Sequence, residues 1–404
     1  MRKVAFFSML ADGHLRRLLP LVSGLSARGV AAHVFTHRRF EREISAAGGT
    51  FVDLFGKYPL EAADADSFPV AMRSVGYAAH YVEAVQRELE TLDVSLVVYD
   101  TFAMIGRVAA ARMGVPHVNL CAGHNVDPDR FQRILEADPR VVVSRQCRRA
   151  VELLRDRYGV RNASPFSYVA GLSPFLNVYG EPPEYLTAAE RAVFEPVAFF
   201  GSLPSAEEIV ARNREDLPSC FGSDATLKVY ISFGTVVWRS YATEALAALD
   251  AIADALSRYP RARGVISLGG TTLDAAAMRA LTRPNVTVHD FVDQWAILRE
   301  ADVFITHHGL NSTHEAIYHG VPMISHPFFW DQPALAAKCQ AFGLAIPLTG
   351  APRGAVTEAR VHAALAALHE RRDPMRAALA AAKNYELQVI AARPDVLDRI
   401  LALC

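Results

Sequence analysis

The sequence predicts an α/β fold with two Rossmann-like domains that face each other across a cleft. Three observations support this prediction. The chain has 404 residues, which is longer than one ordinary domain. Short apolar runs alternate with longer amphipathic stretches, and this is the pattern of a doubly wound parallel sheet. The alternation stops in a polar, irregular segment at residues 205–224 and then resumes.

The first series of strands and helices predicts an N-terminal domain over residues 1–204. Its expected strands are short apolar runs at residues 4–8, 33–36, 51–54, 96–99 and 117–120. The first run follows a basic start and briefly resembles a secretion signal, but it is short and no small-x-small cleavage site follows it. We therefore interpret it as the first core strand.

The second series predicts another domain over residues 225–384, joined to the first by a linker at 205–224. Its expected strands lie at residues 229–233, 265–268, 286–289, 303–306 and 323–325. The clearest helix is 243–259, where leucine and isoleucine recur at three- and four-residue steps. Ligands of such sheets bind at the carboxyl ends of the strands, so we expect the functional loops there.

The composition excludes several classes of function. With 51% hydrophobic and 21% charged residues, the chain is typical of a globular protein with an ample core. A formal net charge of −1 gives no general attraction to nucleic acid or to an anionic membrane. No apolar stretch is long enough to predict a transmembrane helix. The cysteines are scattered and lack CxxC spacing, which indicates reduced thiols and a cytoplasmic location.

The segment at residues 303–332 carries the most chemical information. Its first residues predict a buried strand, and Gly309 permits a sharp turn into a helix that begins near residues 311–312. The start of a helix offers unpaired N–H groups and partial positive charge to an anion. A pyrophosphate with an attached nucleoside fits this inventory. The side chains that would hold it are His307, Asn311, Ser312 and Glu315.

A metal site is the alternative interpretation, because the segment contains five histidines. A zinc-protease helix needs two histidines four residues apart around a glutamate, whereas His314 and His319 are five apart and lie on different faces of a helix. No Asp-x-Asp motif is present either. We therefore expect no metal site, and we interpret His308, His314 and His319 as structural or surface residues.

The order and spacing of these residues resemble a known family. The run from His307 to Glu315 reads HHGLNSTHE, and Gly-Val-Pro at 320–322 and Asp331-Gln332 follow it. This resembles the signature of the inverting nucleotide-sugar glycosyltransferases of the GT-B fold, which include plant secondary-metabolite and bacterial macrolide or antibiotic glycosyltransferases. The resemblance implies that Asp331 and Gln332 bind hydroxyls of the donor sugar. It also implies a last helix, within residues 385–404, that crosses back onto the first domain.

Two more motifs resemble donor contacts of this family. Residues 232–235 read Ser-Phe-Gly-Thr, which allows close approach of a phosphate. The implied diphosphate site therefore consists of His307, Gly309, Asn311, Ser312, Ser232 and Thr235. Phe291 and Gln294 correspond to the Trp and Gln of the family's Trp-x-Pro-Gln motif at the nucleobase, and Glu315 completes the nucleoside site. Trp295 is a competing candidate for stacking on the base, unless it is a core residue.

A second loop, at residues 8–14, directly follows the first expected strand. In the resembled family a Gly-His pair at this place carries the catalytic base, which implies that role for His14. Histidine suits the task because imidazole accepts protons near neutral pH. Asp100 ends the strand run at 96–99 on the same edge of the sheet, and the resemblance implies that it orients His14. The structural alternatives are a histidine that only stabilises its turn and an aspartate that caps the next helix.

The chain departs from the family pattern immediately after His14. The family often continues Gly-His-x-Asn-Pro, whereas this chain has Arg16 and Arg17 at the last two positions. Both are expected in the first turn of a helix, where the helix dipole disfavours positive charge. One interpretation is a contact to an anionic or polar group of the acceptor or to the donor diphosphate. The other is exposure to solvent or salt bridging between the domains.

Together these features predict an inverting, metal-independent glycosyltransferase. It would move a sugar from a UDP- or dTDP-sugar, used as co-substrate without any other cofactor, to a hydroxyl of a small molecule, and the resemblance favours a bacterial natural product. The N-terminal domain would bind the acceptor, with the irregular segments at 55–81 and 121–131 shaping its pocket, and the C-terminal domain would bind the donor. A monomer or a homodimer is expected. The alternatives are a nucleotide-sugar epimerase of the same fold and a non-catalytic partner of a glycosyltransferase.

Overall fold

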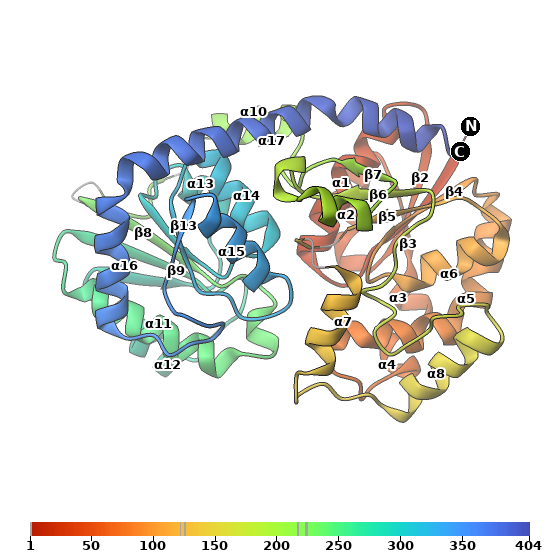
Figure 1. The fold of residues 1–404 in the computed structure, drawn as a ribbon, viewed down its shortest axis with the longest axis horizontal. Coiled ribbons are helices and arrows are strands. Elements are labelled where there is room, and N and C mark those ends of the chain that lie inside the picture. The colour runs from red at the N-terminus through yellow and green to blue at the C-terminus, as the bar shows by residue number, and fades with distance from the viewer. Residues whose placement is uncertain (1, 122, 125–126, 216–217, 223–224) are drawn as a thin grey trace. The chain divides into compact units, whose positions relative to one another are not determined.

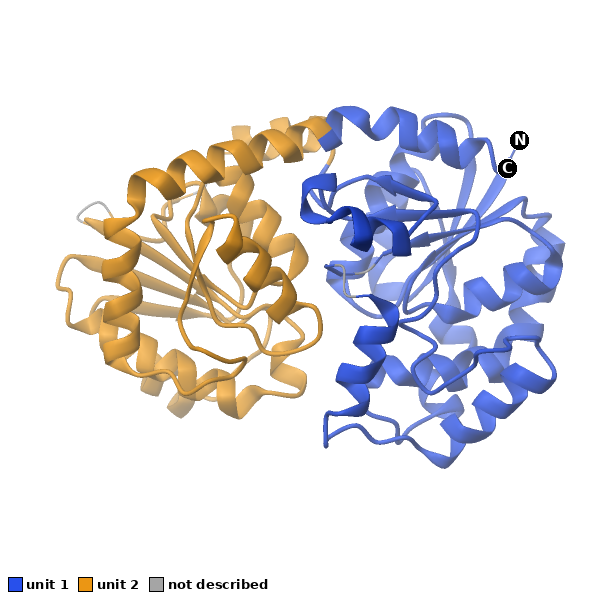
Figure 2. Cartoon of the chain, in the orientation of Figure 1, with its two compact units in different colours: residues 1–204, 389–404 blue, residues 205–388 orange. Residues whose placement is uncertain are grey.

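Two parallel β-sheets organise the structure, and helices pack on both faces of each sheet (Figure 1). The computed structural model describes residues 2–121, 123–124, 127–215, 218–222 and 225–404. The chain forms two compact units, which are coloured separately in Figure 2. Unit 1 consists of Met1–Pro204 and Val389–Cys404, and unit 2 consists of Ser205–Gln388.

The sheet of unit 1 has seven strands in the order β3-β2-β1-β4-β5-β6-β7, and all neighbours are parallel. The strand order reverses between β1 and β4, and such a reversal is where ligands bind in doubly wound sheets. The strands are β1 (Lys3–Phe7), β2 (Ala31–Thr36), β3 (Thr50–Asp53), β4 (Leu96–Asp100), β5 (His117–Leu120), β6 (Leu176–Tyr179) and β7 (Val197–Phe199).

The helices of unit 1 connect these strands and cover the sheet. Helix α1 turns Leu18, Leu21 and Leu25 onto the buried residues of β1, because these leucines recur at three- and four-residue steps. The helices are α1 (Asp12–Ser26), η1 (Arg38–Phe40), α2 (Glu41–Ala46), α3 (Leu54–Lys57), α4 (Leu60–Ala63), η2 (Val70–Met72), α5 (Arg73–Leu92), α6 (Met104–Met113), α7 (Pro128–Glu136), α8 (Arg145–Asp156), η3 (Pro183–Tyr185) and α9 (Ala188–Val193).

The sheet of unit 2 has six strands in the order β10-β9-β8-β11-β12-β13, again all parallel. Its order reverses between β8 and β11, so this unit repeats the topology of the first. The strands are β8 (Leu227–Ser232), β9 (Ala262–Ser267), β10 (Val286–His289), β11 (Val303–Thr306), β12 (Met323–Ser325) and β13 (Ala345–Pro347).

The helices of unit 2 include the one that the apolar periodicity predicts most clearly. This helix, α11, buries Leu249, Ile252 and Leu256 in the core of the unit. The helices are α10 (Ala206–Arg214), η4 (Val237–Arg239), α11 (Ala242–Ser257), α12 (Ala275–Leu281), α13 (Gln294–Leu298), α14 (Leu310–His319), α15 (Gln332–Ala341) and α16 (Glu358–Glu370).

The segment at 205–224, expected to be a linker, contains helix α10 and belongs to unit 2. Ser205 begins this helix by accepting a hydrogen bond from the Glu208 N–H at 3.1 Å. Near its end, Asn213 accepts a hydrogen bond of 3.0 Å from the indole of Trp295. The segment is therefore packed structure over its first half. Residues 216–217 and 223–224 lie outside the described part of the chain.

The last helix, α17 (Arg372–Leu401), passes from unit 2 into unit 1, as the GT-B prediction requires, and begins earlier than expected. Met375 packs in the core of unit 2, whereas Leu397 and Ile400 pack in the core of unit 1. Arg393 anchors the second part by donating hydrogen bonds to the carbonyls of Phe200, Leu203 and Pro204. Within the described residues, no helix is both long and apolar enough to cross a membrane.

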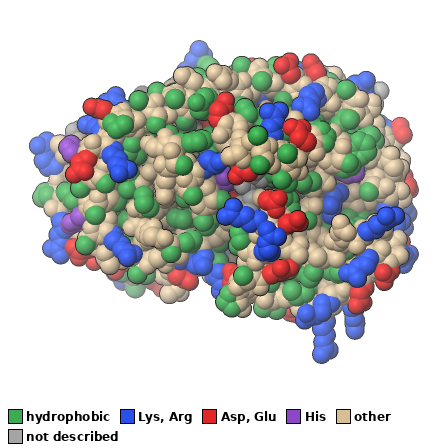
Figure 3. Space-filling view, viewed as in Figure 1, with side chains coloured by type: hydrophobic (Ala, Val, Ile, Leu, Met, Phe, Trp, Pro, Cys, Tyr) green, Lys and Arg blue, Asp and Glu red, His purple; other side chains and the backbone are tan. Residues whose placement is uncertain are grey.

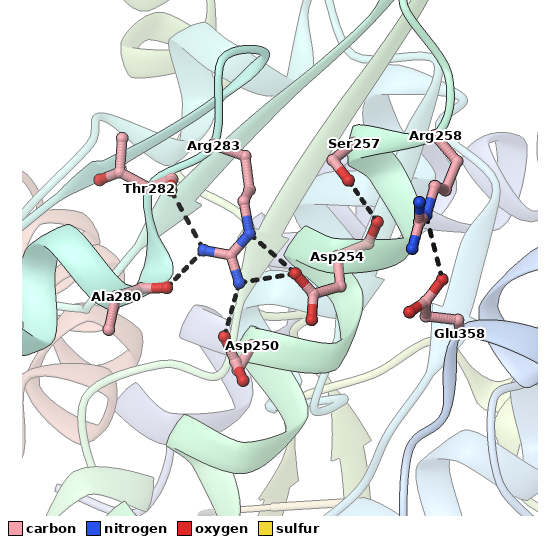
Figure 4. A network of polar contacts seen from close by, with 8 residues as sticks. All are labelled: Asp250, Asp254, Ser257, Arg258, Ala280, Thr282, Arg283 and Glu358. Atoms are coloured by element: carbon pink, nitrogen blue, oxygen red, sulfur yellow. Dashed lines mark hydrogen bonds and ion pairs between the residues drawn. The ribbon is translucent and has the colours of Figure 1, made fainter.

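Ion pairs on the surface connect neighbouring helices of unit 2. Arg283, after α12, donates to Asp250 and Asp254 of α11 at 2.8 Å, and Arg258 lies 3.4 Å from Glu358 of α16 (Figure 4). Such exposed pairs each contribute roughly 0–1 kcal/mol to stability. On the face shown in Figure 3, basic and acidic side chains are interspersed, in keeping with the formal net charge of −1.

Candidate active site

His14 and Asp100 lie together at the carboxyl edge of the unit 1 sheet. His14 is in the first turn of α1, which follows β1, and Asp100 is the last residue of β4. Strands β1 and β4 are paired neighbours in the sheet. The pair therefore lies at the point where the strand order reverses, which is the usual ligand site of this topology.

The Nδ1 atom of His14 is hydrogen-bonded to Oδ2 of Asp100. Asp100 is only 2% exposed, and its other oxygen accepts a hydrogen bond from the Phe102 N–H at 3.0 Å. Asp100 thus caps the turn before α6 and orients His14 at the same time. With the Nδ1 proton directed at the carboxylate, Nε2 is the basic nitrogen of the ring.

The two arginines that follow have different environments. Arg16 is exposed, whereas Arg17 is buried. The Arg17 guanidinium donates to the carbonyl of Cys121 and packs against Gly180, where a Cβ atom would lie 2.5 Å from Nη2. Arg17 is therefore an internal residue of unit 1, and the expected exposure to solvent is wrong for it. The sequence around Arg17 does not reveal this burial, because the Cys121 carbonyl and Gly180, which it contacts, are distant from it in the chain.

Unit 2 carries the residues expected at the diphosphate, at the ends of the adjacent strands β8 and β11. Ser232 ends β8, and its hydroxyl accepts a hydrogen bond of 3.3 Å from the Gly234 N–H. His307 follows β11, and its ring packs between two glycines, Gly234 and Gly309. A Cβ atom at Gly234 would be 2.6 Å from His307 Nε2, and one at Gly309 would be 2.4 Å away. Both positions must be glycine for the ring to occupy this place, and Gly234 also has a φ of +72°.

Helix α14 begins directly after this histidine. Gly309 is its N-cap residue and provides no side-chain cap, so the first backbone N–H groups can bind an anion. Asn311 and Ser312 lie in the first turn of the helix and are partly exposed. Thr235, at the end of the other loop, is exposed. The expected diphosphate contacts thus come from two loops and one helix start of the same unit.

Three of the expected donor-site residues form a hydrogen-bonded chain. The Gln294 amide donates to Glu315 Oε2 at 2.7 Å, and the Ser312 hydroxyl donates to Gln294 Oε1 at 3.2 Å. Phe291 is 61% exposed, so its ring is open to stacking by a base. Trp295 is only 2% exposed and stacks on Tyr318 with ring centroids 5.0 Å apart. Trp295 is therefore a core residue and not the stacking surface.

The two residues expected to bind the sugar, Asp331 and Gln332, have different environments in the structure. Gln332 is buried, and its side-chain oxygen accepts hydrogen bonds from the N–H groups of Phe328 and Phe329 at 2.9 and 3.2 Å. This oxygen shapes the loop before α15, a role that the linear motif does not reveal. Asp331, at the N-cap position of α15, is partly exposed.

His307 and His308, which follow β11, are buried and neutral at neutral pH. Burial lowers the pKa of His307 to about 4, and burial with neighbouring histidines lowers that of His308 to about 3. His308 is hydrogen-bonded to Ser325 at 2.7 Å, and His314 lies 2.6 Å from Glu386 of α17. An anion here would be held by neutral donors and helix N–H groups. In the part of the chain that the structure describes, no three His, Cys, Asp or Glu side chains form a group that could hold a metal ion.

Two buried polar contacts have no local sequence signature. One is the contact of His314 with Glu386, which are 72 residues apart. The other is in unit 1, where His124 lies 2.7 Å from Glu181 and the Tyr179 hydroxyl donates to the same carboxylate at 2.6 Å. Residues 122 and 125–126 of the loop expected at the acceptor lie outside the described residues.

Known proteins are similar to this chain in sequence and in fold. Residues 211–372 match the family model described as UDP-glucoronosyl and UDP-glucosyl transferase. The chain is 23% identical over 346 residues to the uncharacterised UDP-glucosyltransferase YdhE of Bacillus subtilis (strain 168), covering 84% of this chain and 83% of that protein. It is 25% identical over 361 residues to the oleandomycin glycosyltransferase of Streptomyces antibioticus, covering 85% and 78%.

Solved structures show the same fold over the full length. The glycotransferase of kitacinnamycin has a TM-score of 0.77 with 21% identity, covering 99% of each chain. The spinosyn rhamnosyltransferase SpnG, complexed with thymidine diphosphate, has a TM-score of 0.66 with 19% identity, covering 98% of this chain and 100% of that one. The GT-B fold, the family-model match over residues 211–372 and the likeness to these relatives over most of the chain show that the protein is a glycosyltransferase that is similar to the UDP-glycosyltransferases.

Proposed function

We propose that this glycosyltransferase transfers a sugar, with inversion, from a UDP- or dTDP-sugar to a hydroxyl group of a small-molecule acceptor. The observation that carries the proposal is the hydrogen-bonded pair of His14 and Asp100 at the carboxyl edge of the unit 1 sheet. Unit 1 would bind the acceptor, and unit 2 would bind the donor.

His14 would act as the general base. As the acceptor oxygen attacks the anomeric carbon, its proton passes to Nε2 of His14. The bond from the anomeric carbon to the diphosphate breaks, and the nucleoside diphosphate leaves with the bonding electrons. Attack opposite the leaving group inverts the anomeric configuration. Asp100 would stabilise the imidazolium that forms, and a base placed in this way contributes roughly 10²–10⁴ in rate.

The donor would be held entirely by unit 2. Its diphosphate would be bound by the start of α14 and by the loops around it, through His307, Gly309, Asn311, Ser312, Ser232 and Thr235. These donors are already oriented, so they stabilise the charge that develops on the leaving diphosphate. Phe291, Gln294 and Glu315 would hold the nucleoside. Asp331 would bind sugar hydroxyls, and Gln332 would fix the loop that presents it.

The relatives support the two nucleotide choices and the acceptor class. One relative is named as a UDP-glucosyltransferase, and one structure contains thymidine diphosphate. The relatives named for oleandomycin, kitacinnamycin and spinosyn favour a natural-product acceptor for this chain as well.

The test is incubation with UDP-glucose or dTDP-deoxysugars and a panel of hydroxylated acceptors, followed by mass spectrometry of the products. We expect acceptor mass to rise by one sugar residue, with release of UDP or dTDP and an inverted anomeric centre by NMR. His14→Ala should abolish transfer and retain nucleotide binding. Turnover of the nucleotide sugar to an isomer without acceptor would contradict the proposal.

A further inference from the structure

Helix α14 begins at the proposed donor site, and a buried polar contact joins it to helix α17. His314 Nδ1 lies 2.6 Å from Oε1 of Glu386, and the two side chains are 0% and 1% exposed. His314 lies between two residues of the donor site, Ser312 and Glu315. Glu386 belongs to α17 and is 72 positions further along the chain.

This contact links α14 to α17 in a specific geometry. A buried carboxylate or imidazole is costly unless it is hydrogen-bonded, so each group requires the other at a fixed distance and direction. Helix α14 has other polar contacts at both ends: near its start, Ser312 and Glu315 are hydrogen-bonded to Gln294. At its far end, Tyr318 accepts a hydrogen bond of 3.2 Å from Asn213, and Lys383 of α17 lies 4.3 Å from the Tyr318 ring. Of the two contacts with α17, that of His314 is nearer to the start of α14.

We propose that Glu386 is a positioning residue for the nucleotide-sugar site and acts through His314. The inference rests on the proposed function, which places the donor diphosphate and ribose at the start of α14. While Glu386 holds His314 in place, the neighbouring Ser312 and Glu315 keep their hydrogen bonds to Gln294. Without this contact the helix start moves relative to that residue, and the diphosphate and the nucleoside lose aligned donors and acceptors.

The first test replaces the carboxylate and measures nucleotide binding. Glu386→Leu should raise the Kd of UDP or dTDP by about tenfold, because a buried charge-assisted hydrogen bond is lost. The KM for the nucleotide sugar should rise with it, while the KM for the acceptor stays unchanged. Glu386→Gln, whose side-chain oxygen still accepts from His314, should retain most of the affinity.

Met375→Ala is the matched control for a general loss of stability. Met375 lies on the same helix and is buried in the unit 2 core, and it is not part of the donor site. Its removal should lower the melting temperature and leave the nucleotide Kd unchanged. If Glu386→Leu lowers the melting temperature and likewise leaves Kd unchanged, Glu386 is only structural and the inference is wrong.

A double variant covers the case in which Glu386→Leu does not fold. His314→Leu combined with Glu386→Leu removes both polar partners and leaves neither group unpaired. We expect this variant to fold and to bind nucleotide more weakly than the wild type; wild-type affinity would overturn the inference. Ser312→Ala separates the two proposals. If Ser312→Ala leaves nucleotide binding unchanged, the proposed donor site fails; if it weakens binding while the Glu386 variants do not, only the positioning role fails.

Discussion

Replacing Asp100 by asparagine tests the proposed base most directly. One carboxylate oxygen accepts from the Phe102 N–H at 3.0 Å, and the other accepts from His14. Asparagine has one oxygen and can replace only one of these acceptors. If it keeps the bond to Phe102, its NH₂ group faces Nδ1 of His14. The ring proton then moves to Nε2, and the nitrogen that should take the acceptor proton is already protonated.

The expected loss is therefore the whole contribution of the base. General-base catalysis contributes roughly 10²–10⁴ in rate, so kcat should fall by that factor, which corresponds to about 3–5 kcal/mol of transition-state stabilisation. Asparagine has nearly the same shape, so the melting temperature and the nucleotide Kd should change little. In the double variant with His14→Ala we expect no further loss, because the two residues act as a unit.

The assay is release of nucleoside diphosphate under saturating donor and acceptor, with nucleotide binding measured separately by calorimetry. Asp12→Asn is the control, because Asp12 is in the same helix turn but pairs with Arg39 at the surface, at 3.1 Å. It should leave kcat unchanged. A kcat for Asp100→Asn within about threefold of wild type, with binding intact, would refute the assignment of His14 as base.

Three more predictions follow from the donor unit. Gly234→Ala should abolish nucleotide binding in a calorimetric titration, because the new Cβ atom would lie 2.6 Å from His307. Gly270→Ala is the control: Gly270 also has a positive φ, but no atom lies within 4 Å of its Cβ position, so this variant should still bind nucleotide. Burial lowers the pKa of His326 to about 4. Between pH 6.5 and 4 this histidine is therefore protonated in the unfolded state but not in the folded state, so its contribution makes the free energy of unfolding fall as pH falls, by up to about 1.4 kcal/mol per pH unit. His326→Phe, at a site lined by Phe233 and Phe328, should flatten the pH dependence of unfolding in this range, and an unchanged slope would contradict this. Transfer activity should survive EDTA; activity lost with EDTA and restored by magnesium would refute metal independence.

The elements that the sequence predicts well are those with a local physical cause. Strands β5, β10, β11 and β12 have the expected bounds, and each is a short run that contains two or more apolar residues. Strand β6, which contains Asn177, is not among the expected strands. The structure buries this asparagine and bonds it to Asn119 of β5 and to the backbone of Ser173. A buried amide satisfied by partners so distant in sequence has no signature in a hydropathy pattern.

The same distinction applies to the candidate site. The arrangement of Gly309, Asn311 and Ser312 depends on a turn and a helix start, which are local, and the structure places them as expected. The roles of Arg17 and Gln332 depend on which backbone groups lie opposite them. Arg17 donates a hydrogen bond to the Cys121 carbonyl, which is distant in the chain, and the side-chain oxygen of Gln332 accepts from a backbone N–H of the loop before α15. Neither role follows from spacing along the chain.

His14 and Asp100 are the instructive exception, because they are 86 residues apart and yet were paired from the sequence. The resemblance to the glycosyltransferase family implies this pair, and the sheet topology accounts for the contact. Each residue was assigned to the carboxyl end of a buried strand, and in a doubly wound sheet the first and fourth strands of a unit are neighbours. The contact of His314 with Glu386 has no such intermediate, since it joins two helices whose relative position depends on packing alone. A residue pair can thus be predicted over a long separation when the fold class fixes the edge on which both members lie.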